Sequence, residues 1–201
     1  MRAEAIFTGT ELLLGQTLNT NSQLLQQELA ELGIDLYFQI TVGDNLDRCV
    51  EALNQAAVRS DLIIMGGGLG PTEDDLSRES LAKTLGLELI RNEQAFQIMS
   101  RYFRERGIPI SAKNEKQALI PSGGEVLDNP IGTAPGVWLA TQMNGQNKIF
   151  ALLPGPPREF KKMLHEVLRP RLEQVLGDKH PKLAYKVLRF CGIGESTLDE
   201  A

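Results

Sequence analysis

The sequence lacks the features by which secreted and zinc-binding proteins are recognised. It has only two cysteines in 201 residues, Cys49 and Cys191, which are far apart and form no Cys-X-X-Cys pair. A disulfide framework or a structural zinc site is therefore not expected. Cys49 lies at helical spacing from Leu46 and Leu53, and we predict that it belongs to the core.

The sequence also lacks an excess of basic charge and any long apolar run. Its 21 Lys and Arg residues against 26 Asp and Glu residues give a formal net charge of −5, whereas domains that bind nucleic-acid phosphates usually carry a basic face. No apolar run approaches the roughly 18 residues that span a bilayer, and the polar start MRAEAIFTGTE is unlike a signal peptide. We therefore expect a cytoplasmic protein with no nucleic-acid or membrane partner.

Strands and helices alternate regularly in the first half of the chain. Short apolar runs predict strands, and amphipathic runs between capping residues and glycines predict helices. Strands are expected at 3–7, 34–42 and 61–65, and helices from the caps at 19–22 to Gly33, from Asp44 or Asn45 to about Arg59, and from near Thr72 to Gly86. This alternation predicts an α/β fold, with a mostly parallel sheet covered by helices on both faces.

The second half of the chain is less regular. A helix is expected at 92–106, strands at 137–140 and 149–153, and a further helix after LLPGPPREF with Phe160 and Met163 on its apolar face. The pattern changes after Pro170. We therefore divide the chain into a domain at 1–170 and a segment at 171–201 that begins a following small domain or linker and is incomplete.

The most informative stretch is DLIIMGGGLGPTEDDL, residues 61–76, in which Gly66, Gly67, Gly68 and Gly70 follow a strand. It matches neither the P-loop nor the dinucleotide fingerprint, because the residues after Gly70 are Pro71 and Thr72. Glycines nevertheless let the backbone approach a ligand closely, and helix N-termini attract anions. The loop is therefore predicted to hold phosphate. Thr72 is a further candidate binding residue, and with Asp75 it has the spacing of a capping box.

Three acidic residues, Glu73, Asp74 and Asp75, follow the glycines directly. One interpretation is that they only complement the dipole of the helix that follows. The alternative is that Asp74 and Asp75 hold a divalent cation, Mg²⁺ or Mn²⁺, that bridges to the phosphate, since magnesium is commonly held by one or two carboxylates and phosphate oxygens.

The Gly9 loop, the Asp44 turn and the glycine loop at 66–70 all follow strands and are therefore expected to gather at one edge of the sheet, where ligands bind in parallel sheets. Other polar residues near these strand ends are expected at the same edge. Glu11 is a candidate metal ligand or general base, or else a solvated residue at a helix start. Thr10, Asn21 and Asp44 are candidate lining residues, although Thr10 and Asn21 are also good helix caps.

Two Gly- and Pro-rich loops of the second half are candidate walls of the pocket. They contain Gly132 and Thr133, and Pro154 and Gly155; formation of a turn alone explains them equally well. Arg158 follows the second loop and could pair with a phosphate or be a solvated surface arginine. Lys113 and Lys116 leave the same two alternatives open.

The motifs together resemble a known family. GGLGPTEDD (67–75) resembles the glycine loop of molybdopterin-binding domains of the MoaB/MogA type. TGTELLLGQTLNTNS from Thr8, KQALIPSGGEVLDNPIGTAPGV from Lys116, LLPGPPREF from Leu152 and GIGES from Gly192 are similar to the CinA-like branch, the competence/damage-inducible proteins. These matches run in order from about residue 4 to 196.

The resemblance implies a three-layer α/β/α sandwich and a divalent-metal-dependent pyrophosphatase that splits ADP-ribose into AMP and ribose 5-phosphate. It assigns Gly67, Gly68 and Gly70 to the phosphate loop and Asp75 to the motif carboxylate, and Asp44 matches a second acidic position of the wider fold. The family often has Asp where this chain has Asn19. Longer members add a nicotinamide-mononucleotide amidohydrolase domain, an activity we do not expect here.

The leading functional hypothesis is therefore a metal-dependent hydrolase of a nucleotide diphosphate, with ADP-ribose as substrate, Asp75, Asp74 and Glu11 as catalytic residues, and Asp75 and Asp74 as metal ligands. Two alternatives stay open. One is a molybdopterin-binding or nucleotidyl-transfer domain. The other is a non-catalytic nucleotide-binding module of a longer protein. Related domains commonly self-associate, which favours a homo-oligomer.

Overall fold

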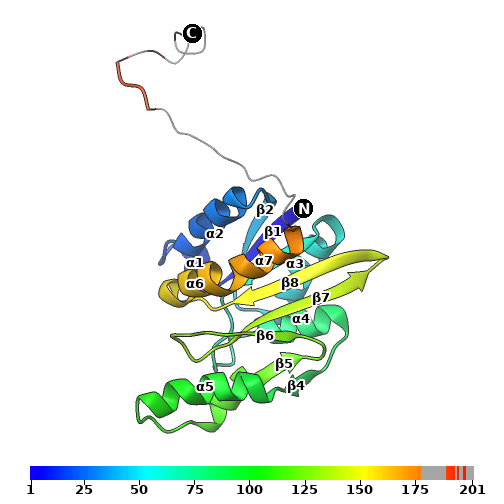
Figure 1. The fold of residues 1–201 in the computed structure, drawn as a ribbon, viewed down its shortest axis with the longest axis vertical. Helices are drawn as coiled ribbons and strands as arrows, with labels where there is room; N and C mark the ends of the chain where they lie inside the picture. Colours follow the sequence, from blue (N-terminus) through cyan, green and yellow to red (C-terminus); the bar gives the residue numbers. More distant parts are fainter. Residues whose placement is uncertain (178–188, 193, 195–196, 198–201) are drawn as a thin grey trace.

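A six-stranded sheet forms the centre of the structure, a computed structural model that describes residues 1–177, 189–192, 194 and 197 (Figure 1). The strand order is β2-β1-β3-β8-β7-β6. The first four in this order are parallel, and β7 and β6 are antiparallel to the strands beside them. Their bounds are β1 Arg2–Thr8, β2 Asp35–Val42, β3 Leu62–Gly66, β6 Glu125–Leu127, β7 Gly136–Met143 and β8 Gln146–Leu153.

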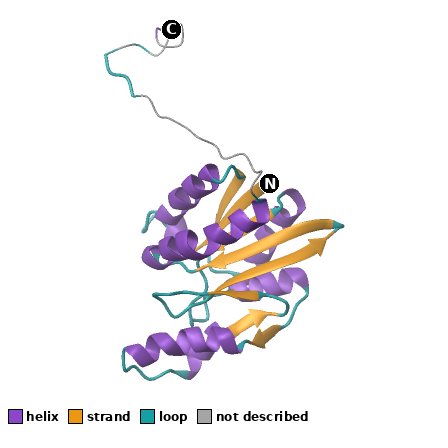
Figure 2. Cartoon of the chain, in the orientation of Figure 1, coloured by secondary structure: helices purple, strands orange, loops and turns teal. Residues whose placement is uncertain are grey.

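Helices cover both faces of this sheet (Figure 2). Successive residues of a strand point to opposite faces, so that Ile63 packs with α3 (Leu46–Arg59) and α4 (Ser77–Leu85), whereas Ile64 packs with α2 (Thr20–Glu31) and the C-terminal helices. The latter are α6 (Pro157–Met163), a π-helical segment (Leu164–Leu168) and α7 (Arg169–Leu176). The chain therefore has the predicted mixed α/β fold, with a mostly parallel central sheet between two helical layers.

A smaller unit is inserted between α4 and β6. It consists of β4 (Leu89–Arg91), α5 (Glu93–Glu105), a 3₁₀ helix (Ala112–Ala118) and β5 (Leu119–Pro121), which pairs antiparallel with β4. In Figure 1 this unit lies at the end of the molecule opposite the N-terminus. Its 3₁₀ helix carries Lys116, which contacts the acidic turn that follows the glycine loop.

The predicted strands and most predicted helix boundaries are confirmed. Asn19, Asn45 and Asn92 each accept a hydrogen bond from the backbone three residues later and so cap α2, α3 and α5. Gly86 ends α4 in the left-handed conformation. Cys49 is 1% exposed and lies in the core, as predicted.

The predicted start of the third long helix near Thr72 is wrong. Helix α4 begins at Ser77, and residues 71–76 form a turn before it. Asp75 Oδ2 accepts from the backbone N–H of Thr72, as the second member of a capping box does, but the reciprocal bond is missing: the hydroxyl of Thr72 donates to Asp75, and the N–H of Asp75 donates to the carbonyl oxygen of Thr72. Lys116 also donates to the carbonyl oxygens of Thr72 and Asp75, which holds the turn out of helical geometry.

The division of the chain at residue 170 stays a prediction. Helix α7 crosses that position and continues to Leu176, with Leu172 fully buried. Most of the segment expected to form a strand, a turn and a new helix, 184–201, lies outside the described residues. Within the described part of the chain, no helix has the length and apolar character needed to cross a membrane.

Candidate functional site

A cavity of about 560 Å³ lies at the carboxyl ends of the parallel strands. The Gly9 turn after β1, Asp44 after β2, the glycine loop after β3 and Pro154 and Gly155 after β8 all line it. The prediction that these loops gather at one edge of the sheet is therefore confirmed. Among the predicted site residues the lining ones are Glu11, Asn21, Asp44, Gly66, Gly67, Gly68, Gly70, Asp74, Asp75, Thr133, Pro154 and Gly155.

The glycine loop has a backbone that side chains would disrupt. Gly67 and Gly68 have φ angles of 106° and 65°, which L-residues rarely adopt. A Cβ on Gly67 would lie 2.7 Å from the carbonyl oxygen of Thr8, and a Cβ on Gly68 would overlap with the hydroxyl of Ser77. That hydroxyl donates to the carbonyl oxygen of Gly67 at 2.8 Å and fastens the loop to the start of α4.

The loop presents hydrogen-bond donors without partners. The N–H of Gly67 donates to Leu153 O at 3.0 Å and so extends the pairing of β3 with β8. The next three N–H groups, of Gly68, Leu69 and Gly70, donate no hydrogen bond within the described residues. The hydroxyl of Thr8, a residue that also lines the cavity, is buried and has no hydrogen-bond partner in the described part of the chain. Consecutive free N–H groups in a glycine loop favour binding of an anion.

Two of the three acidic residues after the loop line the cavity, namely Asp74 and Asp75. Neither forms an ion pair with a described Lys or Arg; Asp75 instead bonds to Thr72. Because α4 begins only at Ser77, these acids lie outside its first turn. Asp75 lies directly before the N-cap Leu76, so that complementing the helix dipole and binding a cation both stay interpretations of its position.

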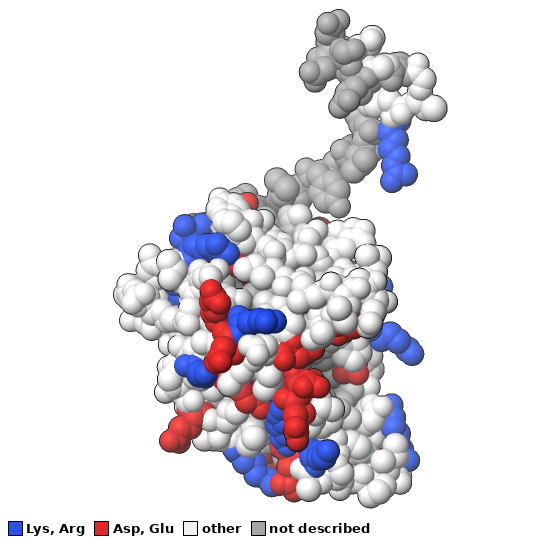
Figure 3. Space-filling model, turned by 180° about the vertical axis from the view of Figure 1, so that it is seen from behind, with Lys and Arg blue, Asp and Glu red and all other residues white. Residues whose placement is uncertain are grey.

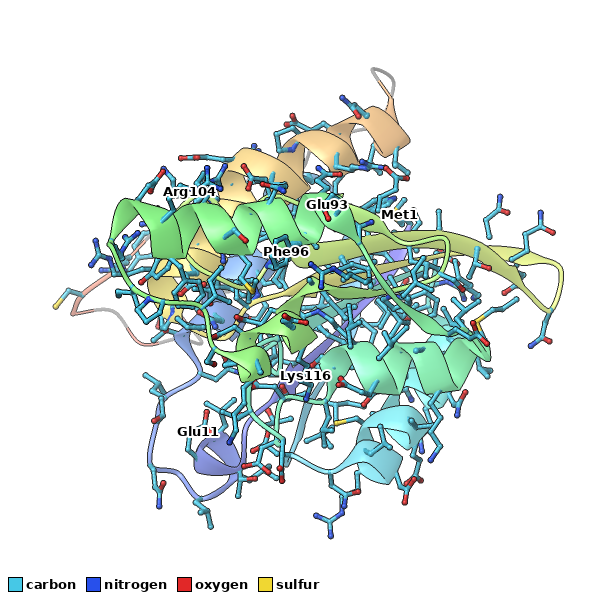
Figure 4. All side chains as sticks on the ribbon, turned by 90° about the horizontal axis from the view of Figure 1, so that it is seen from below. Met1, Glu11, Glu93, Phe96, Arg104 and Lys116 are labelled. Carbon is cyan, nitrogen blue, oxygen red and sulfur yellow. The ribbon has the colours of Figure 1, made fainter. Side chains whose placement is uncertain are left out.

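Lys116 fixes the turn that carries these acids. Its Nζ donates to the carbonyl oxygens of Thr72 at 2.8 Å and Asp75 at 2.6 Å and pairs with Glu79 at 3.1 Å. Of the two alternatives for Lys116, phosphate ligand or solvated cation, the structure therefore supports neither. Figure 4 labels Lys116 on the 3₁₀ helix and Glu11 on the short helix α1 (Thr10–Leu13).

Several predicted residues hold other parts of the cavity wall in place. Thr10 donates through its N–H (2.9 Å) and its hydroxyl (2.8 Å) to Asp44 Oδ2, so that it positions Asp44 and does not line the cavity itself. Asn21 donates from Nδ2 to Gly155 O at 2.7 Å. Thr72 likewise does not line the cavity and orients Asp75.

Arg158 is a predicted binding residue that the structure places on the surface. It is exposed at the start of α6 and does not line the cavity. Its neighbour Glu159 lines the cavity instead, because successive residues of a helix point in different directions. The interpretation of Arg158 as a solvated surface arginine is the one that agrees with the structure.

Sequence analysis missed the polar network of the opposite wall. Asn129 is fully buried; its Oδ1 accepts from the N–H of Gly132 at 2.9 Å, and its Nδ2 donates to Ala134 O and to Glu159 Oε2. Gln117 donates to the hydroxyl of Thr133. Gly132 thus shapes this wall without lining the cavity. The signal that could have found Asn129 is its place as an Asx-turn residue before Pro130.

A buried cation lies behind the glycine loop. Arg78, in the first turn of α4, is 1% exposed and donates from Nη1 to Leu69 O at 3.0 Å and from Nη2 to Pro135 O at 3.3 Å. Burial lowers the pKa of Arg78 to about 10, while the charges of Glu79 and Asp75 act in the opposite direction. At neutral pH the guanidinium therefore stays charged.

The cavity does not contain a preformed metal cage. Among the described residues no group of three or more His, Cys, Asp or Glu side chains is placed to hold a metal ion. Asp74 and Asp75 nevertheless offer two carboxylates at the cavity beside the free N–H groups of the loop. Such a set fits a magnesium-type ion that takes its remaining ligands from water and from a bound phosphate.

The chain is similar to proteins of one family. Residues 4–174 match the family described as a probable molybdopterin binding domain. A competence-damage inducible protein of Moorella thermoacetica is 54% identical over all of this chain and 47% of its own length, and one of Bacillus pumilus is 47% identical over 98% of this chain and 46% of its own. The chain thus spans about half the length of the curated relatives it matches.

Solved structures show the same fold. A protein CinA with unknown function from Thermoplasma acidophilum superposes with a TM-score of 0.76 at 32% identity, covering 88% of this chain and 99% of its own. The tungsten cofactor synthesizing protein MoaB from Pyrococcus furiosus has a TM-score of 0.60 at 15% identity, covering 87% and 94% of the two chains. At that identity the second likeness shows the fold alone.

Proposed function

This chain belongs to the molybdopterin-binding domain family, in its CinA-like, competence-damage inducible branch, and we propose that it binds a small phosphorylated ligand in the cavity at the strand ends. The phosphate would lie on the loop formed by residues 67–70. One observation carries the proposal. The N–H groups of Gly68, Leu69 and Gly70 have no acceptor within the described residues and follow one another in a glycine loop that lines the cavity.

The size of the cavity bears on the class of ligand. At about 560 Å³ it falls within the range of roughly 300–1,000 Å³ that is usual for sites of drug-sized ligands and cofactors. That volume suits a nucleotide or a pterin phosphate and is large for inorganic phosphate alone. Because the carboxylates of Glu11, Asp44 and Glu159 also line the cavity, the ligand should offer hydroxyl or N–H donors as well as phosphate.

Binding can be tested by calorimetry with ADP-ribose, ADP, molybdopterin and adenosine, with and without Mg²⁺. We expect the phosphorylated compounds to bind and adenosine to bind much more weakly, because adenosine offers the free N–H groups no anion. Equal affinity for adenosine and ADP would contradict a phosphate site on the loop. Tighter binding of molybdopterin than of ADP-ribose would assign the ligand to the pterin class.

Hydrolysis of a nucleotide diphosphate, with ADP-ribose as substrate, is the second candidate. It is favoured by Asp74 and Asp75, which line the cavity beside the loop without an ion-pair partner among the described residues. They would hold a divalent cation, which neutralises charge on the diphosphate. A water molecule would attack one phosphorus, with Glu11 as a candidate base. The bond from that phosphorus to the bridging oxygen would break, and AMP and ribose 5-phosphate would leave.

This second candidate has its own test. AMP release from ADP-ribose is measured with Mg²⁺ or Mn²⁺ for the wild type, Asp75→Asn and Asp74→Asn. Asp47→Asn serves as the control, because Asp47 is an exposed acid that pairs with Lys83. We expect metal-dependent release in the wild type and the control and its loss in Asp75→Asn. Binding of ADP-ribose without any release of AMP would reject hydrolysis and leave a binding module.

A further inference from the structure

Arg78 is a buried charge that forms no ion pair among the described residues; the carboxylates of Glu79 and Asp75 act on it only from beyond ion-pair distance. Its side chain is 1% exposed, and no carboxylate of the described residues lies within ion-pair distance. Two of its nitrogens donate to main-chain carbonyl oxygens, and Nε has no hydrogen-bond partner within residues 1–177 or the other described positions. By contrast, the fully buried carboxylate of Glu4 is paired with Arg59 through two hydrogen bonds. Because an unpaired charge in a protein interior is costly, the position of Arg78 calls for an anion.

The acceptors of Arg78 belong to two different walls of the cavity. Leu69 lies in the glycine loop, and Pro135 lies at the end of the loop that follows Asn129. Arg78 therefore ties these two walls together from behind, on the protein side. No atom of Arg78 lines the cavity, so that its charge acts on a ligand through the peptide groups between them.

The peptide group between Leu69 and Gly70 transmits this charge. In a trans peptide the N–H points opposite to the C=O, and no peptide bond of the described chain is cis. Since the carbonyl of Leu69 accepts from Arg78, the N–H of Gly70 points away from Arg78. That N–H is one of the three without an acceptor, and Gly70 lines the cavity. A hydrogen bond to the carbonyl from a cation polarises the peptide and strengthens its N–H as a donor.

We propose that Arg78 is the positioning residue of the anion site. It orients the Leu69–Gly70 peptide toward the cavity, and the phosphate of the ligand is its missing counter-charge. The inference rests on the proposed function, because it assumes that the loop binds phosphate. It explains how a cavity lined by the carboxylates of Asp44, Asp75 and Glu159 holds an anion. The compensating charge is buried behind the loop, where water does not screen it.

The test separates the charge of Arg78 from its hydrogen bonds. Arg78→Lys keeps a positive charge with a single donor group, and Arg78→Gln keeps donors for carbonyl oxygens without a charge. Lys148→Met is the matched control, because Lys148 is also 1% exposed and bonds to a main-chain carbonyl, that of Ser60. It lies on β8 at the end remote from Leu153 and does not line the cavity. Affinity for ADP-ribose and for pyrophosphate is measured by calorimetry, and stability by urea unfolding.

We expect Arg78→Gln to weaken both ligands by about 10- to 100-fold, the range for loss of a charge-assisted interaction. Arg78→Lys should bind more tightly than Arg78→Gln. Lys148→Met should lower stability and leave affinity within about twofold, since no ligand contact changes.

Two results would overturn the role of Arg78 and leave the proposed function intact. The first is a wild type that binds both ligands while Arg78→Gln binds them equally well. The second is that Arg78→Lys binds the ligands no more tightly than Arg78→Gln does. Arg78 would then only join the two walls through its hydrogen bonds, and its charge would not contribute to binding. If one Arg78 variant does not fold, the affinity of the other, compared with the wild type and Lys148→Met, still shows whether Arg78 contributes to ligand binding. A wild type that binds neither ligand would overturn the proposed function and the role of Arg78 with it.

Discussion

A pair of glycine substitutions tests the geometry of the loop quantitatively. Gly68 in the loop and Gly86 after α4 both have φ near 65°. An alanine in this conformation costs about 1–2 kcal/mol, of which about 0.4–1 kcal/mol is offset because alanine restricts the unfolded chain more than glycine does. Around Gly86 no atom of the described residues lies within 4 Å of an added Cβ. Gly86→Ala should therefore lower the free energy of unfolding by about 1 kcal/mol.

Gly68→Ala carries the same backbone cost and a steric one. Its Cβ would overlap with Ser77 Oγ, which donates to Gly67 O at 2.8 Å, and would lie 3.0 Å from the buried hydroxyl of Thr8. Moving Ser77 leaves the carbonyl of Gly67 without that donor, which costs about 1–3 kcal/mol. Gly68→Ala should therefore destabilise the fold by about 2–4 kcal/mol and abolish binding of phosphorylated ligands, whereas Gly86→Ala keeps that binding.

The assay is urea unfolding followed by circular dichroism, with the dependence of the free energy on urea expected to be the same for both variants. Calorimetry with ADP-ribose is run on the folded proteins. Equal losses of stability in the two variants would refute the steric argument. Unchanged affinity in Gly68→Ala would refute the assignment of the loop as the phosphate site.

Three further predictions follow from the walls of the cavity. Lys116→Met should destabilise the protein by about 1–3 kcal/mol, since it leaves the carbonyl oxygen of Asp75 without a donor and that of Thr72 with only the N–H of Asp75. It should also weaken ADP-ribose binding, whereas Lys113→Met, at an exposed position, should change neither in the same two assays. Asn129→Ala should lower both the melting temperature and the affinity for ADP-ribose, because the loop at 129–134 loses the side chain to which the N–H of Gly132 and the carbonyl oxygen of Ala134 are hydrogen-bonded. An unchanged affinity would show that this wall does not touch the ligand. Burial lowers the pKa of Arg78 to about 10, and a bound anion favours its protonated form, so that affinity for ADP-ribose should be constant from pH 7 to about 9 and fall as the pH rises through about 10. Calorimetry across this range measures the fall, and a level affinity would show that the guanidinium stays charged throughout.

The layered fold could be predicted because each element carries its own signal. Alternating apolar residues and capping asparagines mark the strands and helices locally, and a parallel sheet brings the ends of its strands to one edge whatever the rest of the chain does. This is why Gly9, Asp44 and the loop at 66–70 were correctly expected to meet. The fold followed from local patterns.

The details of the site could not be predicted because they depend on contacts distant in sequence. Lys116 holds the turn before α4 from more than forty positions away, so that Thr72 and Asp75 matched a helix start that does not form. Likewise, Asn129 donates a hydrogen bond to Glu159, which lies thirty positions later in the chain. The sequence around either residue does not predict this pair. The burial of Arg78 is another such case, since its acceptors lie on two separate loops.

The distribution of charge over the surface could not be predicted from the sequence either. The sequence gives a net charge of −5, but only the structure shows its distribution. On the face seen in Figure 3, acidic side chains gather in the middle with lysines and arginines among them. A count of charges would not have distinguished the carboxylates that line the cavity, such as Asp74, from paired ones such as Asp47, which bonds to Lys83.

The most direct measurement of the central claim is a titration of ¹⁵N-labelled protein with ADP-ribose, followed by amide NMR. The account predicts that the N–H resonances of Gly68, Leu69 and Gly70 shift most, because these groups gain an anionic acceptor, while those of Gly86 and Gly145 stay in place. Saturating ligand that leaves the three loop resonances unmoved, or that shifts amides only at a distance from the cavity, would contradict it.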